Sequence, residues 1–150
     1  MKLAIGCDEA AYDLKVEIIK HLKSRNIEVT DFGADAGVAV LYPDIGIKVA
    51  EAIARGDFER GILLCGTGIG MSISANKVPG IRAAVCHDPY SAERSRKSNN
   101  AQIMCMGARV IGVELAKYLV DIWLNCDFSG GGSTAKVKRI MEYENKTKAI

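Results

Sequence analysis

The chain has 150 residues, of which 49% are hydrophobic and 25% are charged, and its formal net charge is +2. This size and balance predict one globular domain, residues 1–150, with a single substantial core. The near-neutral charge and the lack of a long basic run argue against a nucleic-acid partner. No apolar run is long enough to span a bilayer, and no signal-peptide profile opens the chain. The five cysteines form no CxxC pair, so we expect free thiols in the cytoplasm and no metal site.

Apolar runs predict five strands separated by helices. The expected strands are 2–7, 27–32, 61–65, 81–86 and 102–106. The expected helices are 10–25, 42–55, a short one around 72–76, 88–97, 113–124 and 134–146, and residues 33–41 are expected to form a loop. Strand alternating with helix predicts an α/β fold, a Rossmann-like three-layer sandwich with a five-stranded parallel sheet and helices on both faces.

A glycine-rich turn, Gly66-Thr67-Gly68-Ile69-Gly70, follows the third expected strand. Three glycines let backbone approach a ligand and aim amide groups at an anion. Cys65 closes the strand, and a thiol beside such donors favours its thiolate form. With the hydroxyl of Thr67, the turn could form a base that faces an oxyanion hole. The spacing is not that of the dinucleotide fingerprint, and no Walker lysine follows the glycines.

The position of Cys65 in the predicted sheet decides between a structural and a functional role. By itself, a cysteine at the end of an apolar strand is more often a core residue than a catalytic one. In doubly wound sheets, however, ligands bind beyond the carboxyl ends of the strands, commonly between the first strand and the third. Asp8 follows the first strand and Cys65 ends the third. Two independent patterns thus indicate one crevice and favour a functional Cys65.

The block CGTGIGMSISANKVPGIRAA, with GCDEAAYDLK before it and NNAQIMCMGARVIG after it, resembles the type B ribose-5-phosphate isomerases and the related galactose-6-phosphate isomerase subunits. The resemblance covers essentially the whole chain. It implies aldose–ketose isomerisation of a phosphorylated sugar, first of all ribose 5-phosphate to ribulose 5-phosphate, without metal or cofactor. It also implies a homodimer, or a dimer of two such dimers, in which the C-terminal helix packs on a partner and each site is shared.

The resemblance also implies residue roles. Cys65 would move a proton between C2 and C1 of the sugar, and Thr67 with the glycine-turn amides would stabilise the enediolate oxygen. Arg109 and basic residues near the last helix would face a partner's phosphate. The implied substrate-binding residues are Asp8, Glu9, Tyr42, Gly66, Gly68, Gly70, Asn99, Arg109 and Lys136.

Three parts of the sequence depart from the family pattern. Glu9 stands where a histidine is usual, and Ser98 replaces the histidine credited with opening the furanose ring. The phosphate-gripping Gly-Gly-Arg-His reads Gly-Gly-Gly-Ser at residues 130–133. His87 follows the fourth strand and is either a replacement acid or substrate contact, or a simple loop residue. His21, on the first helix, is expected to be structural or solvated.

The serine at position 98 leaves two kinds of sugar phosphate as possible substrates. Ribose 5-phosphate is mostly a closed furanose, whereas a tetrose 4-phosphate cannot close that ring and needs no ring-opening acid. The stretches HDPYSAER and SNNAQI also resemble family members assigned to erythritol breakdown, which makes erythrulose 4-phosphate an alternative substrate. A further alternative is a non-catalytic or partner-dependent subunit of a hexose-6-phosphate isomerase, although the presence of Cys65 and Thr67 argues against it.

Overall fold

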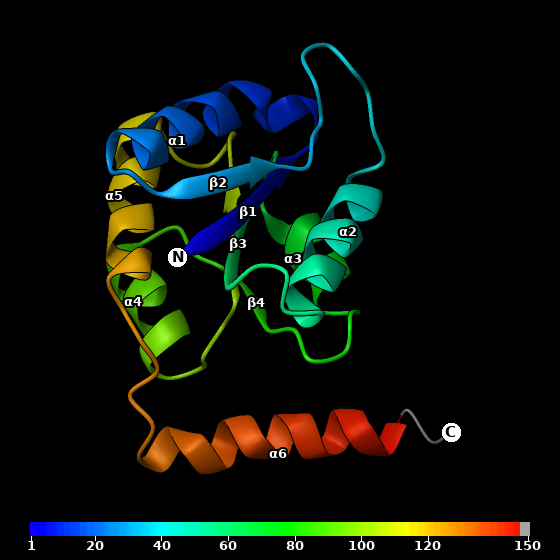
Figure 1. Ribbon diagram of the computed structural model, residues 1–150, viewed down its shortest axis with the longest axis vertical. Helices are drawn as coiled ribbons and strands as arrows, with labels where there is room; N and C mark the ends of the chain where they lie inside the picture. The colour runs from blue at the N-terminus through cyan, green and yellow to red at the C-terminus, as the bar shows by residue number, and fades with distance from the viewer. Residues whose placement is uncertain (148–150) are drawn as a thin grey trace.

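The computed structural model describes residues 1–147, in which a parallel sheet lies between two layers of helices (Figure 1). The strands are β1 (Lys2–Cys7), β2 (Glu28–Asp31), β3 (Arg60–Cys65), β4 (Ala83–Val85) and β5 (Ile103–Gly107). The helices are η1 (Glu9–Ala11), α1 (Tyr12–Ser24), α2 (Tyr42–Ala54), α3 (Ile69–Ala75), α4 (Pro89–Lys97), α5 (Val113–Leu124) and α6 (Gly132–Thr147). The predicted five-stranded parallel α/β fold is confirmed.

The strand order is β2-β1-β3-β5-β4, so the chain runs outward in opposite directions from β1 and from β3. The switch point therefore lies between these two strands, as the sequence predicts. In their register Cys7 is opposite Leu64, and on the other side of β3 Cys65 is opposite Gly107. The carboxyl ends of β1, β3 and β5 are thus nearly level, and the loops that follow them meet at one edge.

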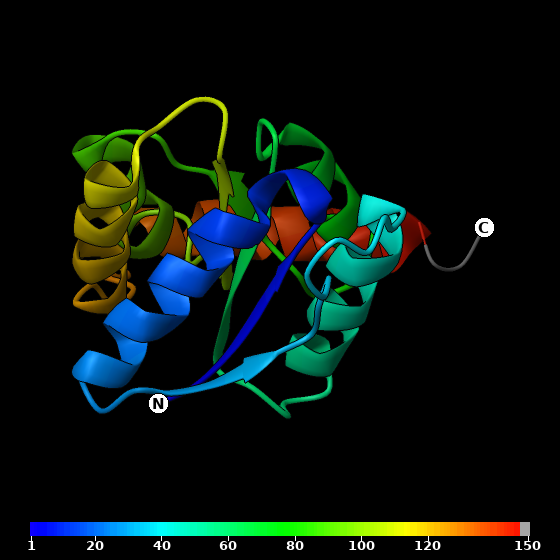
Figure 2. The same ribbon diagram turned by 90° about the horizontal axis from the view of Figure 1, so that it is seen from above.

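Alternation along the strands builds two cores, one on each face of the sheet (Figure 2). Ile62 and Leu64 of β3 face the core shared with α1, α4 and α5. Leu63 and Cys65 face the opposite core, shared with α2 and α3. Trp123 of α5 is fully buried in the first core. The turn after Cys65 therefore opens toward α2 and α3.

Strand β4 and helix α3 depart from the sequence prediction in ways that the fold explains. β4 covers only 83–85 of the expected 81–86, because it lies at the edge of the sheet and pairs only with β5. Its strand residues are half-buried, not enclosed on both sides. Helix α3 begins at Ile69, earlier than expected, because Gly68 adopts the left-handed conformation (φ 78°) that lets the chain turn directly from β3 into the helix.

Helix α6 extends beside the α/β body as a separate arm (Figure 1). None of its described side chains is buried. Its Glu144 accepts a hydrogen bond from the Gly80 amide at 2.8 Å, and Arg82 contacts the Met141 sulfur at 3.0 Å. The expected packing of this helix on a partner subunit stays a prediction.

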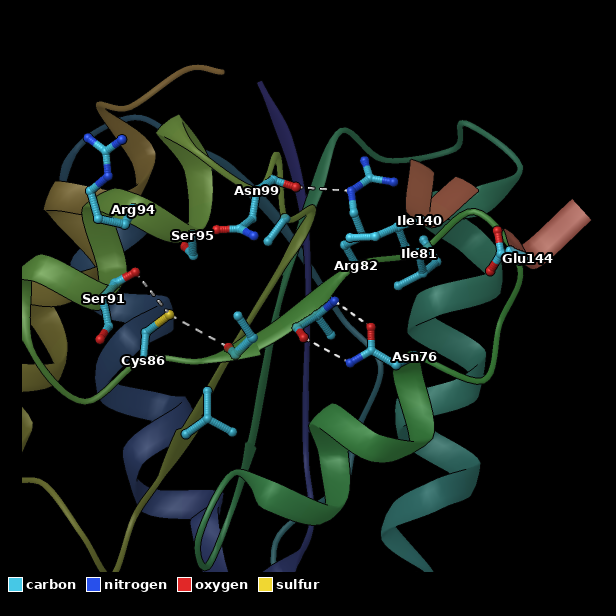
Figure 3. A pocket seen from close by; sticks show the side chains of 14 residues that line it. Asn76, Ile81, Arg82, Cys86, Ser91, Arg94, Ser95, Asn99, Ile140 and Glu144 are labelled. Atoms are coloured by element: carbon cyan, nitrogen blue, oxygen red, sulfur yellow. Dashed lines mark hydrogen bonds between the residues drawn. The ribbon is translucent and has the colours of Figure 1, made fainter. Parts of the chain in front are cut away.

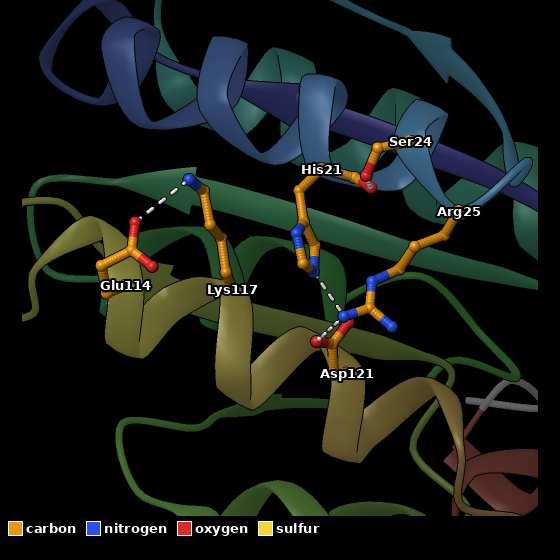
Figure 4. A network of polar contacts seen from close by, with 6 residues as sticks. All are labelled: His21, Ser24, Arg25, Glu114, Lys117 and Asp121. Carbon is orange, nitrogen blue, oxygen red and sulfur yellow. Dashed lines mark hydrogen bonds and ion pairs between the residues drawn. The ribbon is translucent and has the colours of Figure 1, made fainter.

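A polar network joins α1 to α5 (Figure 4). His21 Nε2 lies 2.8 Å from Asp121 Oδ1, and Arg25 donates to Asp121 Oδ2 at 2.6 Å. The expectation of a structural or solvated His21 is met, since its partner is a side chain of the neighbouring helix. None of the helices within 1–147 is long and apolar enough to cross a membrane.

Candidate active site

Cys65 ends β3 with its side chain 4% exposed. The amide of Gly68 donates a hydrogen bond to its Sγ at 3.1 Å. This contact requires the chain to fold back within three residues, which the positive φ of Gly68 permits. The turn thus holds the Cys65 sulfur at the end of β3 beside a directed backbone donor.

The glycine turn rests directly on the end of β5. A Cβ on Gly68 would lie 3.0 Å from the Met106 carbonyl carbon, and one on Gly107 would lie 2.6 Å from Thr67 Cα. The backbone of Arg109 also donates to the carbonyl of Gly66 at 3.0 Å. These close approaches fix the height of Thr67 above the sheet.

A pocket of about 370 Å³ opens over this turn, and its size suits a small polar ligand. It is lined by Asp8, Tyr42, Cys65, Gly66, Thr67, Ile69, Gly70, Ile73 and Arg109. Six of the residues that the sequence singles out as substrate-binding or catalytic therefore come together with Cys65: Asp8, Tyr42, Gly66, Thr67, Gly70 and Arg109. Gly68 belongs to the same turn through its bond to sulfur.

Two pocket residues escaped the sequence analysis. Ile69 and Ile73 lie one turn apart on α3 and line the pocket with half-exposed side chains. The signal that could have found them is an apolar pair at i and i+4 on a short helix that already follows the glycine turn. Opposite them, the ring of Tyr42 packs on Gly70, where an added Cβ would lie 2.5 Å from the ring.

The two acidic residues after β1 have different surroundings. Asp8 lines the pocket and accepts a hydrogen bond from the Ala11 amide, while burial raises its pKa above the ordinary value. Glu9 turns away to the loop, where its carboxylate accepts from the Val40 amide at 3.2 Å. Hydrogen bonds from backbone amides, its own first and Val40 second, lower the pKa of Glu9. Within the described chain Glu9 therefore orders the 33–41 loop and does not line the pocket.

Arg109 lies in the pocket of its own chain, beside Gly66, whose added Cβ would be 3.3 Å from the guanidinium. The Arg109 and Ala108 amides pair with the carbonyls of Gly66 and Cys65, which carries the segment after β5 across the end of β3. The expected contact of Arg109 with a partner's phosphate stays a prediction.

Ser98, Asn99 and Lys136 lie away from this pocket. Ser98 and Asn99 precede β5, so they lie at the amino edge of the parallel sheet, opposite Cys65. Asn99 lines a second pocket of about 580 Å³ that runs along β4 to α6 (Figure 3). Ser98 Oγ accepts from Arg94 Nε at 2.8 Å and also from Arg94 Nη2. Lys136 lines an open depression on α6. One chain therefore does not assemble all of the predicted residues.

His87 contacts the site indirectly. The amide of Gly107 donates to its Nε2 at 2.8 Å, so this nitrogen is an occupied acceptor. Burial lowers the pKa of His87, and the carboxylate of Asp88 opposes that effect. His87 is not among the described residues that line the Cys65 pocket. Together, the fold and pocket define an α/β protein with a buried thiol and a directed backbone amide at its switch point.

Comparison with known proteins gives the family. The family described as Ribose/Galactose Isomerase matches residues 3–140. A relative from Listeria innocua, named Ribose-5-P isomerase B, is 59% identical over 148 residues, which cover 99% of this chain and 100% of the relative. A relative from Pectobacterium atrosepticum, named D-erythrulose-4-phosphate isomerase, is 55% identical over 149 residues, which cover 99% of this chain and 98% of the relative.

Solved structures of similar proteins support the same family. Ribose-5-phosphate isomerase B from Clostridium thermocellum has a TM-score of 0.96 and 52% identity, covering 98% of this chain and 99% of that one. The enzyme from Mycoplasma genitalium with bound ribulose-5-phosphate has a TM-score of 0.90 and 32% identity, covering 96% of each chain. The chain belongs to the ribose/galactose isomerase family and is a sugar-phosphate aldose–ketose isomerase.

Proposed function

We propose that this chain interconverts ribose 5-phosphate and ribulose 5-phosphate through an enediolate, with residues 1–150 acting as one isomerase domain. The observation that carries the proposal is the buried Cys65 thiol, which faces the Gly68 amide inside a pocket of about 370 Å³. The names of the relatives from Listeria innocua and Clostridium thermocellum support this substrate. The free thiols of all five cysteines favour a reducing compartment such as the cytoplasm.

The proton transfer in the proposed reaction needs one base within reach of two adjacent carbons. The Cys65 thiolate takes the proton from C2 of the open-chain aldose and returns it to C1, while a second proton moves from the C2 hydroxyl to the C1 oxygen. Thr67 Oγ1 already accepts a hydrogen bond from the Ile69 amide at 3.2 Å, so its own hydroxyl hydrogen can donate to the enediolate oxygen. Preorganised donors of this kind stabilise the charge that develops in the transition state.

The walls of the pocket suit the rest of the substrate. Asp8 and Tyr42 place a carboxyl and a phenol at the pocket wall, where they contact sugar hydroxyls. Arg109 adds a permanent positive charge for an anionic group of the substrate. Ile69 and Ile73 exclude water from one side.

Replacing Cys65 tests the mechanism. We expect Cys65→Ala to lower kcat/KM for ribose 5-phosphate by about 10³-fold, within the range of general-base removal. Cys126→Ala is the matched control, because Cys126 is also a buried free thiol but lies after α5, away from the pocket. Turnover that survives Cys65→Ala would contradict the proposed role of the thiol.

We further propose that the working enzyme is a homodimer, or a dimer of such dimers, whose sites are shared. In support, Asn99 and Lys136 lie outside the Cys65 pocket of their own chain, and α6 buries none of its described side chains. A second copy related by a two-fold axis would bring these residues to the pocket.

Mixing two inactive variants tests this sharing. A mixture of Cys65→Ala and Asn99→Ala chains, unfolded and refolded together, should regain up to about a quarter of wild-type activity, because half of the dimers then carry one intact site. If each chain carried a complete site, the mixture would stay as inactive as its components.

A tetrose 4-phosphate is the second candidate substrate, and the surroundings of Ser98 favour it. The Ser98 hydroxyl accepts hydrogen bonds from the Arg94 guanidinium. Neither the hydroxyl nor the guanidinium can act as the acid that opens a furanose near neutral pH, since the guanidinium never releases its proton. The name of the Pectobacterium atrosepticum relative agrees with such a substrate. Side-by-side turnover of ribose 5-phosphate and erythrulose 4-phosphate decides between the two: tetrose turnover alone would overturn the pentose assignment.

A further inference from the structure

The end of β5 has an unusual hydrogen-bond partner. β4 ends at Val85, opposite Cys105, so no β4 strand residue stands opposite Gly107. The Gly107 amide would otherwise lack an acceptor on this side, and the imidazole of His87 supplies one at 2.8 Å. His87 thus extends the pairing of β4 with β5 through its side chain.

This contact fixes the protonation state of the ring. A backbone amide can only donate, so Nε2 must be unprotonated and the neutral ring carries its hydrogen on Nδ1. A second proton would set an N–H group against the Gly107 N–H and break the bond. Among the described residues, Asp88 is the charged group that acts on the ring, and its attraction for the protonated form is outweighed by burial.

Gly107 in turn supports the catalytic turn. An added Cβ at Gly107 would lie 2.6 Å from Thr67 Cα and 2.8 Å from the Gly66 carbonyl oxygen, so the two backbones are in contact. On its other side the Gly107 carbonyl accepts from the amides of Val110 and Ile111 at 3.0 and 3.2 Å. A displacement of Gly107 therefore moves Thr67 directly.

We infer that His87 is a positioning residue of the proposed isomerase reaction, in which its neutral ring holds Gly107 and thereby the Thr67 turn in place. Protonation of His87 releases the turn, and activity is lost on the acidic side. This inference rests on the proposed function, and it assigns His87 neither a proton-transfer step nor a contact with substrate.

Two variants separate positioning from acid catalysis. His87→Phe keeps a ring but loses the acceptor, whereas the side-chain oxygen of His87→Gln reaches a similar point, accepts a hydrogen bond and does not titrate. We expect His87→Phe to lower kcat about tenfold with KM nearly unchanged, equally for ribose 5-phosphate and erythrulose 4-phosphate. His87→Gln should restore most of kcat and remove the wild-type decline on the acidic side.

Two kinetic results would overturn the inference. Loss of ribose 5-phosphate turnover in both variants, with erythrulose 4-phosphate turnover kept, would make His87 a ring-opening acid. An unchanged acidic decline in His87→Gln would remove the link between the ring and activity.

A spectroscopic readout is independent of any substrate. ¹⁵N NMR of the wild-type protein at neutral pH should show an unprotonated Nε2 and a protonated Nδ1 in His87. The amide resonances of Thr67 and Gly68 should shift in His87→Phe. When the wild-type protein is acidified, these resonances should change with the same midpoint pH as the protonation of the His87 ring. If the Thr67 and Gly68 amide resonances do not change when His87 is replaced or protonated, the positioning role is refuted, even if the enzyme is active. Failure of Cys65→Ala to lose turnover, by contrast, refutes only the proposed function.

Discussion

Replacing Gly107 by alanine probes the contact on which the catalytic turn rests. The added Cβ would lie 2.6 Å from both the Cα and the carbonyl carbon of Thr67. Ordinary contact begins near 3.4 Å, so the two backbones must separate by about 0.8 Å. Both overlapping atoms belong to backbone, so no side-chain rotation can relieve the clash.

This separation has two measurable consequences. Overpacking of this kind costs about 1–3 kcal/mol, which for a chain of this length lowers Tm by roughly 2–12 °C. A catalytic group misplaced by about 1 Å costs on the order of 10²-fold in rate, so kcat should fall roughly 10- to 100-fold. Calorimetry gives the first quantity and a continuous assay of ribose 5-phosphate turnover gives the second.

Gly112→Ala is the matched control, because a Cβ there meets no atom within 4 Å and its φ of −81° suits any residue. We expect this control to keep both Tm and kcat close to those of the wild type. A Gly107→Ala protein with the same Tm and kcat as Gly112→Ala would refute the claim that the β5 end carries the turn.

Two further predictions concern stability. Burial raises the pKa of Cys7 from 9.0 to about 11, so the folded state keeps a proton that the unfolded state releases; stability should be fully present below pH 9 and fall by up to about 2–3 kcal/mol as the pH rises through 11. Urea unfolding at pH 8 and pH 10.5 should show a smaller loss in Cys7→Ser, and an equal loss would contradict the assignment. Asp121→Asn should cost about 1 kcal/mol in the same assay at pH 7, because Asp121 pairs with both His21 and Arg25, whereas Asp57→Asn, which removes one exposed pair, should cost almost nothing. Equal midpoints for these two variants would exclude a stabilising role for the network.

The sequence predicts the sheet and the crevice because both follow from periodic local signals. Apolar runs and glycines placed the five strands, and the topology then brought Asp8 and Cys65 to one edge as expected. The shortened β4 was beyond this reasoning, because an apolar run does not reveal whether a strand will be central or at an edge.

The direction in which a side chain points could not be predicted from the sequence either. Glu9 follows Asp8 directly, yet it turns to the Val40 amide, and only the path of the 33–41 loop determines this. His87 was correctly placed near the edge that carries the site, but its acceptor role depends on an amide twenty residues further along the chain. Ser98, Asn99 and Lys136 keep their predicted roles as hypotheses, since a single chain does not bring them to Cys65.

The sparse attachment of α6 has a consequence for how the protein unfolds. A helix of 16 residues is marginal in water when it buries no side chain of its own. The two cores of the body, by contrast, are complete without any residue of α6. In an isolated chain the arm should therefore melt before the body does, as a separate cooperative unit with a low opening free energy. A protease should therefore cut the arm before it cuts the body, and the first cut is expected in the segment that follows residue 127.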